Sequence, residues 1–130
     1  MREIRVLHVD DETDFAAAVG KRLARRGVAV RSVTGGGEAL EALASEPFDV
    51  VLLDIKMPGM DGIKVLGEIK QRHPLVEVIM FTAHANTDIV ISSLAMGACD
   101  YLLKPADVDD LLQKIAAAAD RRKGKEEAGA

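Results

Sequence analysis

The sequence predicts an α/β protein built on one doubly wound sheet of five parallel strands. Short apolar runs alternate five times with segments of helical periodicity, a pattern typical of successive βα units whose sheet is covered by helices on both faces. The chain has 130 residues, close to the usual size of one domain. We therefore expect one domain over residues 1–120, followed by a charged flexible tail or the start of a linker over residues 121–130.

Each strand is expected where an apolar run lies. The first two helices are recognised by the residues that end them. The runs lie near Ile4–Val9, Val28–Val33, Asp49–Leu53, Val76–Phe81 and Tyr101–Leu103. The first helix, about Glu12 to Arg26, stops at Gly27, where a left-handed cap is favoured. Leu40 and Leu43 mark the second helix, and Pro47 follows it.

The other three helices are predicted from caps and from apolar spacing. Asp61 is a good N-cap for the third helix, and His73–Pro74 closes it. Asn86 caps the fourth helix, which ends at Gly97. Apolar residues from Val108 to Ile115 follow the i, i+3, i+4, i+7 spacing of a helix, and from Arg121 onward we expect a frayed end.

The composition argues against nucleic-acid binding and against a membrane segment. A net charge of -4 leaves no basic surface for a duplex, and the basic residues from Arg121 to Lys125 are placed to complement a helix C-terminus. No apolar run approaches the roughly 20 residues of a spanning helix. The N-terminus enters a strand without a signal-peptide pattern, so we expect a cytoplasmic location.

Five polar residues fall at or just beyond the ends of four predicted strands. They are Asp10, Asp11, Asp54, Thr82 and Lys104. Doubly wound sheets bind ligands beyond the carboxyl ends of their strands, so these side chains are expected to meet at one edge. Three carboxylates would repel one another unless a cation lay among them. The set therefore suits a hard divalent cation and a phosphoryl group.

Asp54 is the natural nucleophile of this set. A carboxylate can form an acyl phosphate, and Asp is ionised at neutral pH without a base to activate it. Lys104 would supply a point charge and Thr82 a hydroxyl for the transferred group. Taken alone, the Asp10–Asp11 pair is explained by helix capping or solvation as well as by a role in the site. His8, His73 and His84 lack the paired spacing of a zinc site.

Four motifs in order give the chain a resemblance to the receiver domains of two-component response regulators. They are Val9–Glu12, Val51–Asp54 with Met57–Gly62, Phe81–Ala83, and Gly97–Pro105, and together with the flanking elements they span residues 4 to about 120. The segments Thr82–His84 and Gly97–Pro105 are most similar to receivers of the nitrogen-regulatory, enhancer-binding type. The resemblance implies a flavodoxin-like (βα)5 fold with strand order 2-1-3-4-5.

The resemblance also implies the roles of the site residues. Asp54 would be the phosphoacceptor, and Mg²⁺ (or Mn²⁺) would be bound by Asp10, Asp11, Asp54 and the backbone carbonyl of Lys56. Thr82 and Lys104 would contact the phosphoryl group, with Tyr101 turning inward as Thr82 moves. The Lys104–Pro105 peptide bond would be cis, which proline allows at low energy.

The partners implied by the resemblance are a phosphodonor and an output. A sensor histidine kinase or a histidine phosphotransfer protein would donate the phosphoryl group at a face that includes Phe15 and Pro105. The fourth helix, fifth strand and fifth helix would then change their surface for an output domain or partner protein. The chain would be a regulatory domain that supports its own phosphorylation and dephosphorylation, and not an enzyme with a separate substrate.

Three features depart from the family pattern, and two other classes of function compete with it. His8 stands where receivers usually have an apolar strand residue, and residues Gly35–Gly37 loosen the turn before the second helix. Lys56 and His84 occupy the variable positions beside the site, where we hypothesise that they shield the phosphate and prolong its lifetime. A haloacid-dehalogenase type of phosphatase would need a second Asp where Lys56 stands. A receiver-like module that is never phosphorylated would be expected to have lost site residues.

Overall fold

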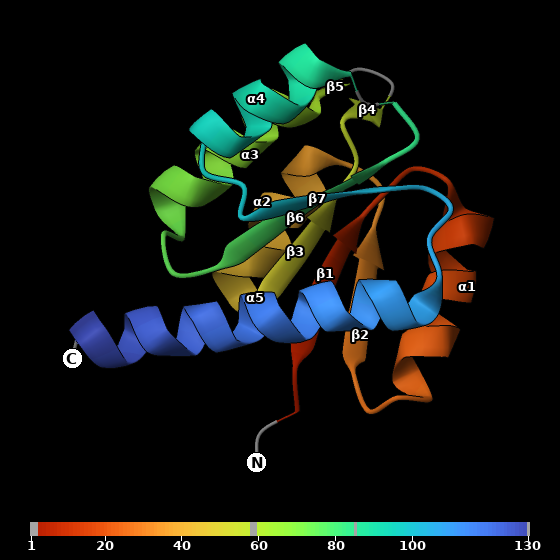
Figure 1. The fold of residues 1–130 in the computed structure, drawn as a ribbon, viewed down its shortest axis with the longest axis horizontal. Helices are drawn as coiled ribbons and strands as arrows, with labels where there is room; N and C mark the ends of the chain where they lie inside the picture. Colours follow the sequence, from red (N-terminus) through yellow and green to blue (C-terminus); the bar gives the residue numbers. More distant parts are fainter. Residues whose placement is uncertain (1–2, 58–59, 85, 130) are drawn as a thin grey trace.

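A five-stranded parallel sheet forms the centre of the molecule (Figure 1). The computed structural model describes residues 3–57, 60–84 and 86–129. The strands of this sheet are β1 (Arg5–Val9), β2 (Ala29–Val33), β3 (Val50–Leu53), β6 (Glu77–Thr82) and β7 (Asp100–Leu103). Their spatial order is β2-β1-β3-β6-β7. Since β6 and β7 are the fourth and fifth strands of this sheet, the predicted order 2-1-3-4-5 is confirmed.

Helices cover both faces of the sheet (Figure 1). Alternate strand residues build two separate cores. One core packs beneath α1 (Thr13–Ala24) and α5 (Val108–Gly129). The other packs beneath α2 (Gly36–Ser45), α3 (Gly62–Arg72) and, at its margin, α4 (Thr87–Ala95). None of the helices in the described ranges is long and apolar enough to cross a lipid bilayer.

The predicted caps are confirmed. The side chain of Asp61 accepts a hydrogen bond from the backbone N–H of Ile63 at 3.0 Å, and that of Asn86 accepts one from Ile89 at 2.9 Å. Gly27 has a φ of 82°, the left-handed conformation that glycine adopts without strain. These residues therefore end or begin helices where the sequence places them.

One local structure was not predicted. The strands β4 (Lys56–Met57) and β5 (Met60–Asp61) form a small antiparallel pair after β3. Two residues are too few to show a period of apolar residues, so the sequence pattern gave no signal for either strand. Pro58 and Gly59, which belong to one of the family motifs, lie outside the described residues.

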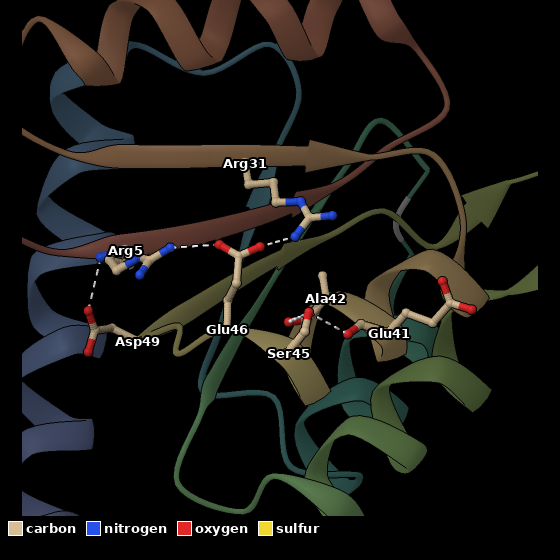
Figure 2. A network of polar contacts seen from close by, with 7 residues as sticks. All are labelled: Arg5, Arg31, Glu41, Ala42, Ser45, Glu46 and Asp49. Atoms are coloured by element: carbon tan, nitrogen blue, oxygen red, sulfur yellow. Dashed lines mark hydrogen bonds and ion pairs between the residues drawn. The ribbon is translucent and has the colours of Figure 1, made fainter.

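A polar network ties the amino end of the sheet together on the side away from the predicted site (Figure 2). The Glu46 carboxylate, just after α2, pairs with Arg5 of β1 at 2.8 Å and also with Arg31 of β2. The backbone N–H of Arg5 donates to the Asp49 carboxylate at 2.9 Å. These contacts tie the start of β1, the middle of β2 and the segment just before β3 to one another.

The expectation of a frayed end from Arg121 is wrong, because α5 continues as a helix to Gly129. Two buried carboxylates at the amino end of the sheet face the last turns of α5. Lys125 Nζ lies 2.5 Å from Oε1 of Glu77, and Arg122 Nε lies 3.9 Å from Oδ1 of Asp49. A buried carboxylate is costly without a positive partner, which favours the ordered helix. A domain boundary at residue 120 stays a prediction.

This pairing gives a testable stability difference. We expect Lys125→Ala to lower the free energy of unfolding by about 1–3 kcal/mol, because the Glu77 carboxylate would stay buried without its ammonium. The exposed Lys123 on the same helix provides the control, and Lys123→Ala should cost under about 0.5 kcal/mol. Urea unfolding measures both. Equal effects of the two variants would show that the ion pair does not hold the helix.

Candidate functional site

The main chain places three of the predicted site residues at the carboxyl edge of the sheet. Three backbone hydrogen bonds carry the parallel ladder one residue past the strands: from Asp10 N to Val33 O (3.0 Å), from Asp54 N to Val9 O (3.1 Å) and from Lys104 N to Thr82 O (2.9 Å). Each residue therefore starts at a fixed place beside its neighbours. The predicted convergence at this edge is confirmed for Asp10, Asp54 and Lys104.

The Lys104 ammonium lies among the carboxylates of the site. Its Nζ is 2.5 Å from Oδ2 of Asp10, 3.0 Å from Oδ2 of Asp54 and 3.6 Å from Oε1 of Glu12. It also lies 4.9 Å from the ring centroid of Phe15. The side chains of Lys104, Asp10 and Asp54 are nearly fully buried. Buried charges of opposite sign stabilise one another only in close contact, and this arrangement provides that contact.

The pairing keeps the site charged despite its burial. Burial alone would lower the pKa of Lys104, but its hydrogen bonds to Asp10 and Asp54 outweigh burial and raise that pKa above its usual value. Burial alone would raise the pKa of Asp10, whereas the contacts with His8 and Lys104 and the N–H of Glu12 lower it. Both groups are therefore ionised at neutral pH.

The acidic residues can offer oxygen ligands to a metal ion. One oxygen each of Asp10, Glu12 and Asp54 lies within 4.8 Å of the others. Oδ1 of Asp54 is buried and has no hydrogen-bond partner among the described residues, so it has a lone pair to offer. Carboxylate oxygens are the ligands preferred by Mg²⁺ and Mn²⁺. This donor set fits a hard divalent cation.

The acidic cluster differs from the predicted ligand set in one member. Asp11 is exposed and does not belong to the cluster, whereas Glu12, which no sequence argument selected, does. Glu12 directly precedes α1, and its backbone N–H donates to Oδ1 of Asp10 at 2.9 Å, so the turn brings it over the edge. Its place within the Val9–Glu12 motif was the available signal. Metal binding by Asp11 stays a prediction.

Thr82 and Tyr101 lie on the neighbouring strands β6 and β7. Thr82 is fully buried, and its Oγ1 accepts a hydrogen bond from the backbone N–H of His84 at 3.0 Å. A hydroxyl that accepts can still donate its own hydrogen. Tyr101 is half-buried and packs against the core beneath α2 and α3. The His84 side chain is exposed, and that of Lys56 lies outside the described part of the structure.

Phe15 and Pro105 border a small hollow beside the site. The hollow, of about 40 Å³, lies between α1 and the start of α5, and its lining includes Phe15, Phe81, Pro105 and Leu111. Phe15 is half-buried and Pro105 is exposed. The Lys104–Pro105 peptide bond is cis, which confirms that expectation. Contact of Phe15 and Pro105 with a kinase stays a prediction.

Gly62 lets the start of α3 approach the main chain of Asp54. Its N–H donates to the carbonyl of Ile55 at 3.0 Å. A Cβ built on Gly62 would lie 2.5 Å from the Asp54 carbonyl oxygen and 2.7 Å from Cα of Ile55. Only glycine fits so close an approach without moving the segment that carries Asp54.

Known proteins with similar sequences agree with the family resemblance described in the sequence analysis. The chain matches the description "Response regulator receiver domain" over residues 6–116. It is 45% identical to the DNA-binding transcriptional regulator NtrC of Escherichia coli over 107 residues, which cover 82% of this chain and 23% of NtrC. The response regulator protein PilR of Pseudomonas aeruginosa is 39% identical over 118 residues, covering 91% of this chain and 26% of PilR. The chain thus spans about a quarter of the length of these relatives.

Solved structures agree with the sequence relatives. A CheY-like response regulator receiver domain protein from Methanospirillum hungatei superposes with a TM-score of 0.90 at 32% identity, covering 95% of this chain and 99% of that chain. NtrX from Brucella abortus superposes with a TM-score of 0.91 at 32% identity, covering 98% of this chain and 30% of that chain. Fold and sequence point to one family.

Proposed function

The chain belongs to the receiver domain family of two-component response regulators, and we propose that it is a switch controlled by phosphorylation of Asp54. The observation that carries this proposal is the buried contact of Lys104 with both Asp10 and Asp54 at the carboxyl edge of the sheet. This contact supports the proposal, because it brings a carboxylate that could act as a nucleophile and an ammonium that could neutralise charge together in one small site. The phosphodonor would be a histidine kinase or a histidine phosphotransfer protein.

The proposed transfer of the phosphoryl group uses the side chains of Asp54, Lys104 and Thr82. A carboxylate oxygen of Asp54 attacks the phosphorus, an O–P bond forms, and the N–P bond of the phosphohistidine breaks with its electron pair on nitrogen. Lys104, already 3.0 Å from Asp54, can stay paired with the transferred group, and Thr82 can donate its hydroxyl hydrogen to a phosphoryl oxygen. Mg²⁺ or Mn²⁺, when bound by the acidic residues, supplies the positive charge that this transfer needs.

The output is proposed to act through α4, β7 and α5. When the Thr82 hydroxyl turns toward a phosphoryl group, the space it leaves favours an inward position of the half-buried Tyr101. Large apolar side chains are exposed on two of these elements, namely Ile91 and Leu94 on α4 and Leu103 on β7. Exposed apolar side chains are available for contact with a partner. A partner or output domain would read the change there.

The relatives support an output outside this chain. NtrC is named as DNA-binding, but this chain covers 23% of it. The net charge of -4 gives no electrostatic basis for duplex binding by the receiver itself. Lys56 and His84 remain our proposed determinants of phosphate lifetime. We do not favour a dehalogenase-type phosphatase, because Lys56 stands where its general acid would be.

Phosphorylation by a small donor tests the proposal. With acetyl phosphate and Mg²⁺, the intact mass should increase by one phosphoryl group that is stable to acid and labile to base. Adding excess EDTA before the donor should prevent the increase, because uncompensated carboxylates repel an anionic donor. Undiminished labelling in EDTA would exclude a role for the divalent cation, and no labelling with Mg²⁺ would contradict the proposed function.

A phosphoryl mimic tests the switch. Beryllofluoride with Mg²⁺ should shift amide resonances from Thr82 to Lys104 most strongly, because that segment carries both proposed moving residues. The control is Thr82→Val, which keeps the shape of the side chain and removes its hydroxyl. In this variant the shifts near Asp54 should persist and those at Tyr101 should shrink. Shifts confined to Asp54 and its loop in the wild type would argue against transmission.

A further inference from the structure

His8 is a fully buried histidine whose ring faces the acidic site. It lies on β1, two residues before Asp10, and its side chain has no exposed surface. Its Nε2 is 3.3 Å from Oδ2 of Asp10. A buried imidazole beside a carboxylate is unusual enough to need a reason, since an apolar residue would fill the same space without burying polar atoms.

The neighbours of His8 determine how it is held. Its ring packs against Phe81 at 5.8 Å between centroids, and edge-on against Phe15 at 6.2 Å. These two aromatic rings limit its rotation. Among the described residues, neither Nδ1 nor Nε2 makes a full hydrogen bond. Because Nε2 faces a carboxylate oxygen, the proton belongs on Nε2, where it points at a negative charge.

The oxygen that His8 faces is shared with Lys104. Oδ2 of Asp10 lies 2.5 Å from the Lys104 ammonium, and the other oxygen of Asp10 accepts the Glu12 N–H at 2.9 Å. The His8 contact is longer and less well aligned than a full hydrogen bond. In this state, therefore, Lys104 is the main partner of Oδ2 and His8 is a second donor beside it.

We infer that His8 is a positioning residue, whose Nε2–H holds the Asp10 carboxylate in the orientation that binds a divalent cation. The inference rests on the proposed function, in which Asp10 binds the cation. A divalent cation at Asp10 would compete with the Lys104 ammonium for the carboxylate even before phosphorylation, and His8 would stay beside Oδ2 and limit its rotation. Outer donors of this kind orient ligands and strengthen metal binding.

The test compares two variants of similar shape that differ in the donor. His8→Gln keeps an amide N–H near the position of Nε2, whereas His8→Met fills the space without a donor. MgCl₂ titration of the unphosphorylated protein, followed by the amide resonances of Asp10 and Asp54, gives the Kd of Mg²⁺ alone. We expect the Kd to rise about tenfold in His8→Met and less than about threefold in His8→Gln.

A second readout separates positioning from chemistry. The Mg²⁺ concentration that gives half-maximal phosphorylation by acetyl phosphate should rise by the same factor in His8→Met, while the rate at saturating Mg²⁺ stays within about threefold of the wild type. If His8→Met does not fold, His8→Val replaces it, with the same expected Kd. Absence of phosphorylation in the wild type would overturn the proposed function, and the Mg²⁺ titration would still decide the role of His8.

Two results would overturn the inference. Wild-type Mg²⁺ affinity in His8→Met or His8→Val would show that no donor is needed on Asp10. A Kd in His8→Gln as high as in His8→Met would show that the packing of the ring against Phe15 and Phe81 matters, and that its N–H does not.

Discussion

Asp54→Asn is expected to reduce phosphorylation by acetyl phosphate to below about a hundredth of the wild-type rate. The amide nitrogen and oxygen of Asn keep the shape of the side chain, but neither is an anionic nucleophile. The variant also removes one carboxylate of the Asp10–Glu12–Asp54 cluster that can offer oxygens to the cation. Incorporation of labelled phosphate, followed with time at saturating Mg²⁺, measures the effect.

Asp61→Asn is the matched control for this loss. Asp61 is exposed and caps α3 through its side-chain oxygen, which Asn also provides. We expect its phosphorylation rate to stay within about twofold of the wild type. If Asp54→Asn were still labelled at a wild-type rate, the phosphoacceptor would be another residue.

Lys104→Met is expected to have the largest effect on stability. It removes the ammonium that lies between the buried carboxylates of Asp10 and Asp54, while it keeps most of the apolar stem. Breaking a buried charge pair from one side costs about 3–5 kcal/mol, and urea unfolding in EDTA should show a loss of this order. Lys64→Met on the exposed side of α3 is the control and should change stability by under about 0.5 kcal/mol.

Both Mg²⁺ and pH should change the difference in stability between Lys104→Met and the wild type. The proposed Mg²⁺ site exists only in the folded protein, so Mg²⁺ should raise the melting temperature of Lys104→Met more than that of the wild type. The raised pKa of Lys104 means that its stabilisation is complete below its unfolded pKa of about 10.4 and is lost as pH rises through the folded pKa. The wild type should therefore lose stability more steeply above about pH 10.4 than Lys104→Met. Parallel pH profiles, or equal stability of the two proteins in EDTA, would contradict this role of Lys104.

Much of the fold follows from local sequence, because its determinants are local. The caps at Asp61 and Asn86 and the turn at Gly27 depend on the conformation of neighbouring residues. The site residues Asp10, Asp54 and Lys104 were found because parallel strands bring their carboxyl ends to one edge. The strand order depended on the family resemblance, since strand spacing alone does not determine it.

The features that the sequence pattern did not predict depend on contacts that form only in the folded chain. The last turns of α5 are ordered by buried carboxylates on β6 and before β3, which no local pattern connects with Lys125 or Arg122. Glu12 joins the acidic site because its turn folds back over the sheet edge. His8 was noted as a departure from the family, but only the structure places it against Asp10.

Reduction of the phosphorylated protein with borohydride tests the central claim most directly, because it identifies the acceptor residue. An aspartyl phosphate is reduced to homoserine, and peptide mass spectrometry locates the change. After treatment with acetyl phosphate and Mg²⁺, we predict homoserine at position 54 and unchanged Asp10 and Asp11. Homoserine at another aspartate, or none in protein that has gained a phosphoryl group, would contradict the account.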